Sequence, residues 1–393
     1  MSLLLINRSP DLRRLRDLGF EIEVRDGILL VSSIPYLDEH GQVQRGTFCC
    51  PLTMVSPSET GAPPNHVMRF IGGYPHKADG GKITALEHEV GPINVGGGVI
   101  ADYGFSNKPA SGFTNYFDKV VSYEAVICAH AQAKDRTATA RTFKPVDAAE
   151  PDSVFLYEDT ASSRAGIGAL ADKLKGQRLA IIGLGGTGSY VLDALAKAPV
   201  AEIHLYDDDL FQQHNAFRSP GAASRDALEQ RLTKVQRYQD LYSAMRKGVV
   251  AHEVRISEVN VDELRQFDYV FVCVDKGDVR RLIYDRLADS SAILIDTGMD
   301  VRVTDNRDAL WGTMRVTSSE PQSREHVFSH VPMAQAEEED LYASNIQVIE
   351  LNALNAMLAI IKWKKLSGFY MDDSKELSAT LNTASNRIYN VER

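Results

Sequence analysis

The sequence predicts an α/β protein in which a mixed or parallel sheet has helices on both faces and is preceded by a smaller α+β domain. Strand and helix patterns alternate from Leu170 onward, which is typical of parallel sheets. A glycine-rich turn joins the first of these strands to the next helix. The first 150 residues instead combine turn-rich strand patterns with one long helical pattern, which indicates a separate domain.

Composition argues against several classes of function. The chain has 393 residues, and its 43 Lys and Arg against 53 Asp and Glu give a net charge of −10, whereas a general nucleic-acid binder needs clustered positive charge. The four cysteines form no C-x-x-C pair, so we expect no structural zinc. No apolar run reaches the roughly 18 residues of a membrane helix, and the N-terminus does not resemble a signal peptide. We expect a cytoplasmic protein that binds neither nucleic acid nor membrane.

Residues 1–150 are expected to form the first domain. Ser9 can cap a short helix that ends before Gly19, and an Asp26-Gly27 turn joins two apolar strands. Residues 141–167 are rich in Pro, Ser and acidic side chains, as linkers are, so we place the second domain at 156–393. The first domain carries no catalytic pattern. Its position suggests that it docks a partner protein.

The second domain is predicted from its alternating elements. Helices are expected up to residue 196, near 227–245 and near 278–288, and strands at 178–182, 202–206, 249–256, 269–274 and 293–296. Residues 317–345 lack periodicity and are expected to form a long crossover loop. An apolar helix that ends near residue 366 follows this loop.

The glycine-rich turn predicts a phosphate site. In Gly183-Leu184-Gly185-Gly186-Thr187-Gly188 the first glycine allows a tight turn, the middle ones let a phosphate approach the backbone, and the last lets helix and strand pack closely. Asp207 ends the next strand, where a carboxylate can accept both ribose hydroxyls. NAD and ATP both present such a ribose, so these residues alone leave the nucleotide open.

Polar residues further along the chain favour ATP. Chemistry at the α-phosphorus of ATP must offset several negative charges, whereas a dehydrogenase needs no fixed cations beyond its pyrophosphate loop. Asn215 and Arg218 follow Asp207 closely, and Lys234 comes in the next helical pattern.

These residues resemble the ThiF/MoeB/HesA and ubiquitin-activating-enzyme adenylation domains. That family carries G-x-G-G-x-G, then D-x-D-x(5)-N-x-x-R, then a lysine, then an aspartate after a further strand. The match covers about 156–369 and implies a Rossmann-like adenylation fold with ATP and Mg²⁺ as cofactors. By resemblance, the nucleotide-binding residues are Gly183, Gly185, Gly186, Thr187, Gly188, Asp207 and Asp209.

The resemblance also implies catalytic roles. It assigns Asn215, Arg218 and Lys234 to the ATP phosphates, with Arg231 as an alternative to the lysine, and it assigns Asp275 to Mg²⁺ and the acyl-adenylate. A second reading of Asp275 is a helix N-cap. Arg164 matches an arginine that reaches the ATP of the other subunit, which implies a homodimer.

The implied reaction needs no general base. A protein C-terminal carboxylate has a pKa of about 3.5, so at neutral pH it is already a nucleophile. In-line attack on ATP would give an acyl-adenylate and pyrophosphate. By resemblance, the substrate is a ubiquitin-like protein of the kind found in bacterial conjugation pathways, and a ubiquitin-conjugating-like protein is a possible second partner.

The chain departs from the family in the crossover loop. Many members pass the acyl group to a cysteine there, but residues 317–345 contain none. The enzyme could stop at the adenylate, pass the acyl group to a partner, or form an ester on Ser329 or Ser344 with His326 or His330 as base. An NAD-dependent oxidoreductase and an inactive adenylation-fold scaffold are the alternative functions.

Overall fold

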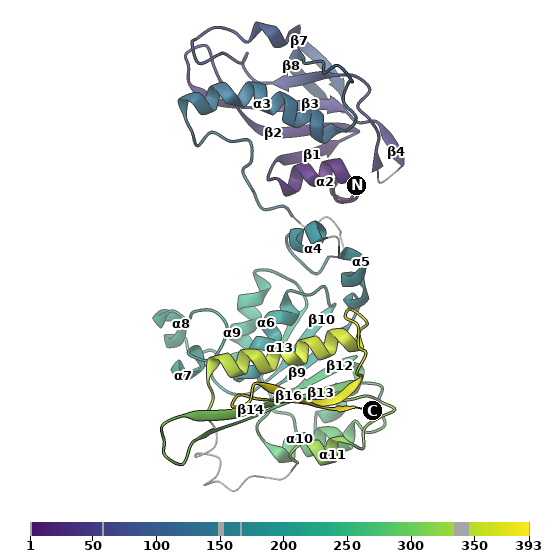
Figure 1. Ribbon diagram of the computed structural model, residues 1–393, viewed down its shortest axis with the longest axis vertical. Coiled ribbons are helices and arrows are strands. Elements are labelled where there is room, and N and C mark those ends of the chain that lie inside the picture. Colours follow the sequence, from purple (N-terminus) through teal and green to yellow (C-terminus); the bar gives the residue numbers. More distant parts are fainter. Residues whose placement is uncertain (1, 57–58, 148–152, 166, 334–345, 393) are drawn as a thin grey trace. The chain divides into compact units, whose positions relative to one another are not determined.

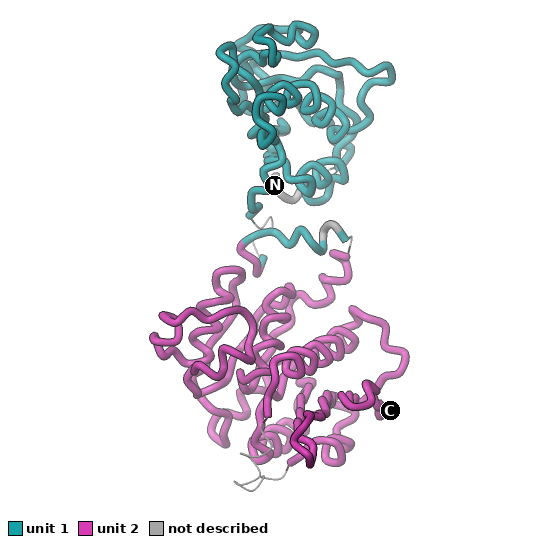
Figure 2. Tube along the Cα trace, turned by 60° about the vertical axis from the view of Figure 1, so that its left-hand side comes forward, with its two compact units in different colours: residues 1–153, 157–165 teal, residues 154–156, 166–393 magenta. Residues whose placement is uncertain are grey.

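The computed structural model describes residues 2–56, 59–147, 153–165, 167–333 and 346–392. The chain divides into two compact units, shown in Figure 2. Unit 1 comprises Met1–Ser153 and Tyr157–Ala165, and unit 2 comprises Val154–Leu156 and Gly166–Arg393. Residues 157–165, which the sequence places in the second domain, therefore belong to unit 1.

Unit 1 is an antiparallel sheet covered by helices. Its six-stranded sheet has the order β1-β2-β3-β6-β8-β7. Leu12 of α2 and Ile127 of α3 pack with Val31 of β2 in one core. The elements are α1 (Ser2–Arg8), α2 (Pro10–Asp17), β1 (Glu21–Arg25), β2 (Ile28–Leu37), β3 (Val43–Pro51), β4 (Met54–Ser56), β5 (Glu59–Thr60), β6 (Val67–Ile71), β7 (Glu87–Gly96), β8 (Val99–Ser106), α3 (Tyr116–Lys134) and α4 (Thr160–Ala165).

Unit 2 is built on a mixed eight-stranded sheet with the order β11-β10-β9-β12-β13-β14-β15-β16 (Figure 1). The first five strands in this order are parallel and the last three are antiparallel to their neighbours. The strands are β9 (Arg178–Ile182), β10 (Glu202–Tyr206), β11 (Val249–His252), β12 (Tyr269–Val272), β13 (Ile293–Val303), β14 (Leu310–Ser319), β15 (Glu376–Asn382) and β16 (Arg387–Glu392). The helices are α5 (Gly168–Ala171), α6 (Gly186–Ala196), α7 (Gln213–Ala216), α8 (Arg225–Glu229), α9 (Lys234–Ser243), α10 (Gly277–Arg286), α11 (Val327–His330) and α13 (Ile349–Leu366).

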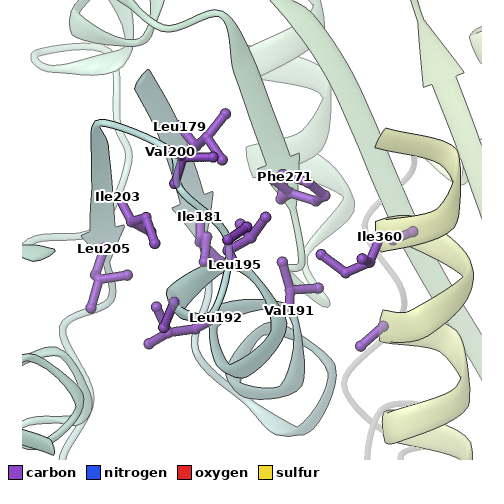
Figure 3. Close-up of a cluster of buried hydrophobic side chains, with 14 of the residues drawn as sticks. Leu179, Ile181, Val191, Leu192, Leu195, Val200, Ile203, Leu205, Phe271 and Ile360 are labelled. Atoms are coloured by element: carbon purple, nitrogen blue, oxygen red, sulfur yellow. The ribbon is translucent and has the colours of Figure 1, made fainter. Parts of the chain in front are cut away.

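Helices cover both faces of this sheet, as predicted. Side chains alternate along β9, so Ile181 faces Val191 of α6 and Ile360 of α13, as Figure 3 shows. Ile182 faces the opposite side, in a core with Ile283 of α10. Among the described residues, no helix combines the length and the apolar character needed to span a bilayer.

The helix predicted near 227–245 is wrong, because two helices occupy this segment. Arg231 adopts a φ of 52°, which interrupts the helical backbone between α8 and α9. The Thr233 side chain then accepts a hydrogen bond from the N–H of Gln236 and caps α9. Lys234 consequently becomes the first residue of a helix.

Three strand boundaries also differ from the prediction. β11 and β12 end at His252 and Val272, whereas β13 continues past Asp296 to Val303 and pairs with β14. β14 extends to Ser319, so the predicted crossover loop begins later than residue 317. Thr317 is fully buried, and its hydroxyl lies 2.8 Å from that of Ser378 on β15. Cross-strand pairing of this kind satisfies polar strand residues that read as a loop in the sequence.

An ion cluster joins the end of α13 to β15. Glu376 is 8% exposed, and its Oε1 accepts a hydrogen bond from Lys365 Nζ at 2.8 Å. Burial by itself would raise the pKa of Glu376, but hydrogen bonds from Lys365 and Ser374 lower it from 4.5 to about 2. A lowered carboxyl pKa contributes stability above the unfolded value, and this contribution is lost as the pH falls from 4.5 towards 2.

We expect Glu376→Gln to destabilise unit 2 at neutral pH by about 2 kcal/mol, because a charge-assisted hydrogen bond is lost. The difference from wild type should shrink between about pH 5 and about pH 2.5. Calorimetric melting over this range measures it, with Glu253→Gln, at an exposed position just after β11, as the control. If the stabilities of wild type and Glu376→Gln changed in parallel with pH, the stabilising role of the ionised Glu376 would be contradicted.

Candidate active site

A cavity of about 370 Å³ opens at the carboxyl ends of the parallel strands of unit 2. Ligands bind at this edge in open α/β sheets, because the helix N-termini and the strand-end loops converge there. Its lining residues are Ile182, Gly183, Gly185, Gly186, Thr187, Tyr206, Asp207, Asp208, Asp209, Arg218, Lys234, Arg255, Ile256, Cys273, Val274, Asp275, Lys276, Val279, Arg280, Thr297, Met299, Ile346, Gln347, Asn352 and Asn355.

The glycines of the turn have different physical roles. Gly183 has a φ of +87°, which L side chains rarely adopt. A Cβ on Gly188 would lie 2.0 Å from the carbonyl oxygen of Gly183, so this glycine allows α6 to pack against the turn, and it does not line the cavity. A Cβ on Gly185 would meet nothing within 4 Å. Gly185 therefore leaves space beside the N-terminus of α6, where an anion is favoured.

Asp207 links the turn to the neighbouring strand. It is 8% exposed, and its carboxylate accepts hydrogen bonds from the N–H of Leu184 at 2.7 Å and from the N–H of Asp209 at 2.9 Å. Lys234 Nζ lies 3.2 Å from Asp207 Oδ1 and 2.6 Å from Asp209 Oδ2. This hydrogen bond from Lys234 lowers the pKa of Asp209. The lysine predicted to meet phosphate thus holds both acids of the motif.

Arg218 faces the cavity with unused hydrogen-bonding capacity. Its Nε is buried and has no hydrogen-bond partner among the described residues. Burial lowers the pKa of Arg218 and the nearby Asp275 opposes that shift, but a guanidinium stays protonated in either case. A buried cation with an unpaired N–H suits an anionic ligand.

The structure places Asp275 in the cavity wall between β12 and α10. Its alternative reading, as the N-cap of the following helix, is wrong: Lys276 occupies that position and makes no side-chain cap. A carboxylate oxygen is the type of ligand that Mg²⁺ prefers, so Asp275 fits the ion that the sequence implies. The carboxylates of Asp207, Asp208 and Asp209 also lie within 4.8 Å of one another, a grouping that the sequence analysis did not consider.

Asn215 does not line the cavity in this structure. It is 4% exposed, and its Oδ1 accepts a hydrogen bond from the N–H of Gln212 at 2.9 Å, which caps α7. The side-chain oxygen of Asn215 therefore caps α7, whereas the predicted contact with phosphate would use the amide Nδ2 as donor and stays a prediction. Capping of a four-residue helix leaves little pattern in the sequence.

Three predicted residues are not among the described residues that line the cavity. Arg164 belongs to α4 in unit 1, and its side chain is outside the described residues. Ser344 also falls outside them. Ser329 is exposed on α11, and the ring of His326, one of its proposed bases, has Nε2 2.7 Å from the carbonyl oxygen of Ser318.

A buried ion triad was missed by the sequence analysis. Asp296 is fully buried on β13, and its carboxylate pairs with Arg280 Nε at 3.1 Å and Arg315 Nη2 at 2.6 Å. Arg280 lines the cavity from α10. Arg280 follows Asp275 by five residues in the sequence. Its partners, Asp296 and the carbonyl oxygen of Thr297, lie on β13, and only the fold brings that strand beside α10.

Because Gly185 and Gly188 have different roles, replacing each with alanine should have different consequences. We expect Gly185→Ala to melt like wild type but to bind ATP at least tenfold more weakly, because the Cβ occupies space meant for phosphate. Gly188→Ala should destabilise unit 2 by about 1–3 kcal/mol through overpacking. Calorimetric melting and ATP titration of the two variants measure these effects. If Gly185→Ala bound ATP as tightly as wild type, or if Gly188→Ala melted like wild type, the assignment of Gly185 to phosphate binding and of Gly188 to packing would be refuted.

Two family models match the chain. The model described as the ThiF family matches residues 161–383, and a model described as a domain of unknown function, DUF6791, matches residues 10–160. The "Adenylyltransferase and sulfurtransferase UBA4" of Saccharomyces cerevisiae (strain YJM789) is 28% identical over 121 residues, 29% of this chain and 26% of that protein. The protein of the same name from Eremothecium gossypii is 27% identical over 121 residues. The chain thus spans about a quarter of the length of these curated relatives.

Several solved structures are similar to part of this chain. Escherichia coli MccB with MccA-N7isoASN is 18% identical, with a TM-score of 0.46 over 57% of this chain and 66% of that chain. PaaA is 15% identical, with a TM-score of 0.47 over 70% and 85%. Likenesses at these scores do not establish a shared activity. The ThiF model, in contrast, spans more than half of the 393 residues and includes every residue that lines the cavity. The chain therefore belongs to the ThiF family.

Proposed function

We propose that the protein is an ATP-dependent adenylyltransferase that activates the C-terminal carboxylate of a ubiquitin-like protein and releases pyrophosphate. One observation supports this most strongly: the guanidinium of Arg218, whose Nε has no hydrogen-bond partner among the described residues, shares a cavity with the carboxylate of Asp275 and the open glycine turn. Family membership and the adenylyltransferase name of the curated relatives agree with it.

Each end of ATP meets a different part of the cavity in this proposal. Asp207 accepts the ribose hydroxyls, and the backbone at Gly185 and Gly186 receives the phosphates at the N-terminus of α6. Arg218 and Lys234 offset the phosphate charge. Lys234 then exchanges its 2.6 Å contact with Asp209 for a phosphate oxygen. Asp275, together with Asp208 and Asp209, would hold Mg²⁺. The bound ion would neutralise negative charge on the pyrophosphate.

The attacking carboxylate needs no base, so positioning and charge compensation account for catalysis. Cys273 is an unsuitable acceptor for the activated acyl group, because burial raises the pKa of its thiol to about 12 and keeps it protonated. We therefore propose direct transfer to a ubiquitin-conjugating-like partner. Ester formation on Ser329 or Ser344 is the alternative.

The proposal extends to the assembly. Arg164 of one subunit would reach the ATP of the other in a homodimer, and unit 1 would dock the ubiquitin-like protein or its acceptor. A cytoplasmic location follows from the supply of ATP and from a reducing environment, in which unpaired thiols such as these four persist. An NAD-dependent oxidoreductase would leave Arg218 and Asp275 without a role, and an inactive scaffold would not need them.

ATP–pyrophosphate exchange tests the proposal directly. With a panel of ubiquitin-like proteins that end in a free carboxylate, the wild-type chain should support exchange with at least one member. Arg218→Ala and Asp275→Ala should each lower the exchange rate by about 100-fold or more, since each removes charge compensation for the transferring group.

The matched control is Arg225→Ala, which removes an exposed arginine of α8 that does not line the cavity. It should exchange at the wild-type rate. Exchange that is absent with every panel member, or equal in the Arg218, Asp275 and Arg225 variants, would refute the proposal. Dependence of the rate on added Mg²⁺ tests the ion separately.

A further inference from the structure

Helix α13 is apolar on the side that faces away from the sheet. It lies across one face of the sheet of unit 2 (Figure 1), and Ala359 and Trp363 on its inner side are fully buried. On the outer side Leu354 and Ile361 are 41% and 43% exposed, and Met357 between them is partly buried. A surface helix normally carries polar residues on its outer side. A contiguous apolar row of this kind indicates a surface that another molecule covers.

The residues of this row repeat as in a coiled coil. Glu350, Leu354, Met357, Ile361 and Lys364 are separated in turn by four, three, four and three residues. Such a repeat of 3.5 residues keeps a row of side chains on one side of a helix, in position to pack against a second helix. We call these five residues the outer row of α13. Their spacing fits a helical partner.

The two ends of the outer row carry opposite charges. Within the described parts of the chain, neither Glu350 nor Lys364 forms an ion pair, and the ion pairs at the end of α13 belong to Lys362 and Lys365. The Nζ of Lys364 lies 4.5 Å from the centroid of the Phe369 ring, a contact that leaves its charge without a carboxylate. Glu350 precedes Lys364 by fourteen residues, or about 21 Å of helix, so the two side chains cannot meet within one chain.

We infer that α13 packs against α13 of a second copy of this chain in an antiparallel arrangement. With a two-fold axis at Met357, each Glu350 lies opposite the partner's Lys364, and each Leu354 lies beside the partner's Ile361. A parallel arrangement would instead set like charges against each other. The opposed dipoles of two antiparallel helices also favour this pairing.

The inference deepens the homodimer of the proposed function, on which it rests, by naming the surface through which the two copies meet. Self-complementarity is the reason to prefer a second copy to another protein. One segment supplies both the acid and the base of each ion pair, and both halves of the apolar contact, as the contact across a two-fold axis requires.

Charge reversal at the two ends of the outer row tests this pairing. Glu350→Lys makes both ends basic and Lys364→Glu makes both ends acidic, so each variant should self-associate at least tenfold more weakly than wild type, because like charges then face each other. The double variant exchanges the two charges and should associate like wild type. Sedimentation velocity of the full chain, from about 1 to about 100 µM, measures the dissociation constants.

A mixture of the two single variants gives the sharpest comparison. Glu350→Lys and Lys364→Glu should form a heterodimer with the affinity of wild type, because a basic row then faces an acidic one. A variant that had failed to fold could not do this. The control is Arg136→Glu, which reverses an exposed charge of unit 1, changes the net charge as much as Lys364→Glu does, and should self-associate like wild type.

Equal self-association of wild type and both single variants, or a mixture that forms no heterodimer, would overturn the pairing of α13 and leave a homodimer built on another surface. A wild-type chain that stays monomeric at every concentration would overturn both the pairing and the proposed homodimer. The proposed activity is tested separately, by ATP–pyrophosphate exchange.

Discussion

The candidate site depends on the hydrogen bonds of one buried carboxylate. Asp207 accepts from the backbone N–H of Leu184, which ties the glycine turn after β9 to the end of β10. It also accepts from the N–H of Asp209 and pairs with Lys234 at the start of α9. A buried charge requires partners of this kind, so the turn, the acidic motif and the lysine hold one another in place.

The order of the strands explains where the cavity lies. β9 is flanked by β10 on one side and β12 on the other, so the chain leaves β9 and later returns to its opposite side. A crevice opens where such connections diverge, and the carboxyl ends of all three strands border it. One side of this crevice holds Asp207 and Lys234. The other side holds Asp275, Arg280 and the asparagines of α13.

The sequence predicted the five parallel strands of this sheet, and the bounds of two of them, β9 and β10, agree with the prediction. β9 is mostly apolar, and apolar residues alternate with polar ones in β10, while the glycine turn and the acidic segment mark where the two strands end. Prediction failed where the hydrogen-bond partners of polar residues lie far along the chain. Thr317 reads as part of a loop, but it pairs with Ser378 more than fifty residues later. The sequence also did not predict the break between α8 and α9, because the positive φ of Arg231 leaves no pattern in the sequence.

The sequence by itself determined the type of site. Its glycine spacing, its D-x-D acids, Arg218, Lys234 and Asp275 are local signals, because each follows a strand at a fixed distance and the strands converge at one edge. Only the tertiary structure decided how individual polar atoms are used. Asn215 and Asn355 are the same residue type, yet the side-chain oxygen of Asn215 caps a helix, whereas that of Asn355, a residue of the cavity lining, has no hydrogen-bond partner in the described part of the chain. Hydrogen-bond partners of buried atoms come from segments far along the chain, so packing alone assigns them.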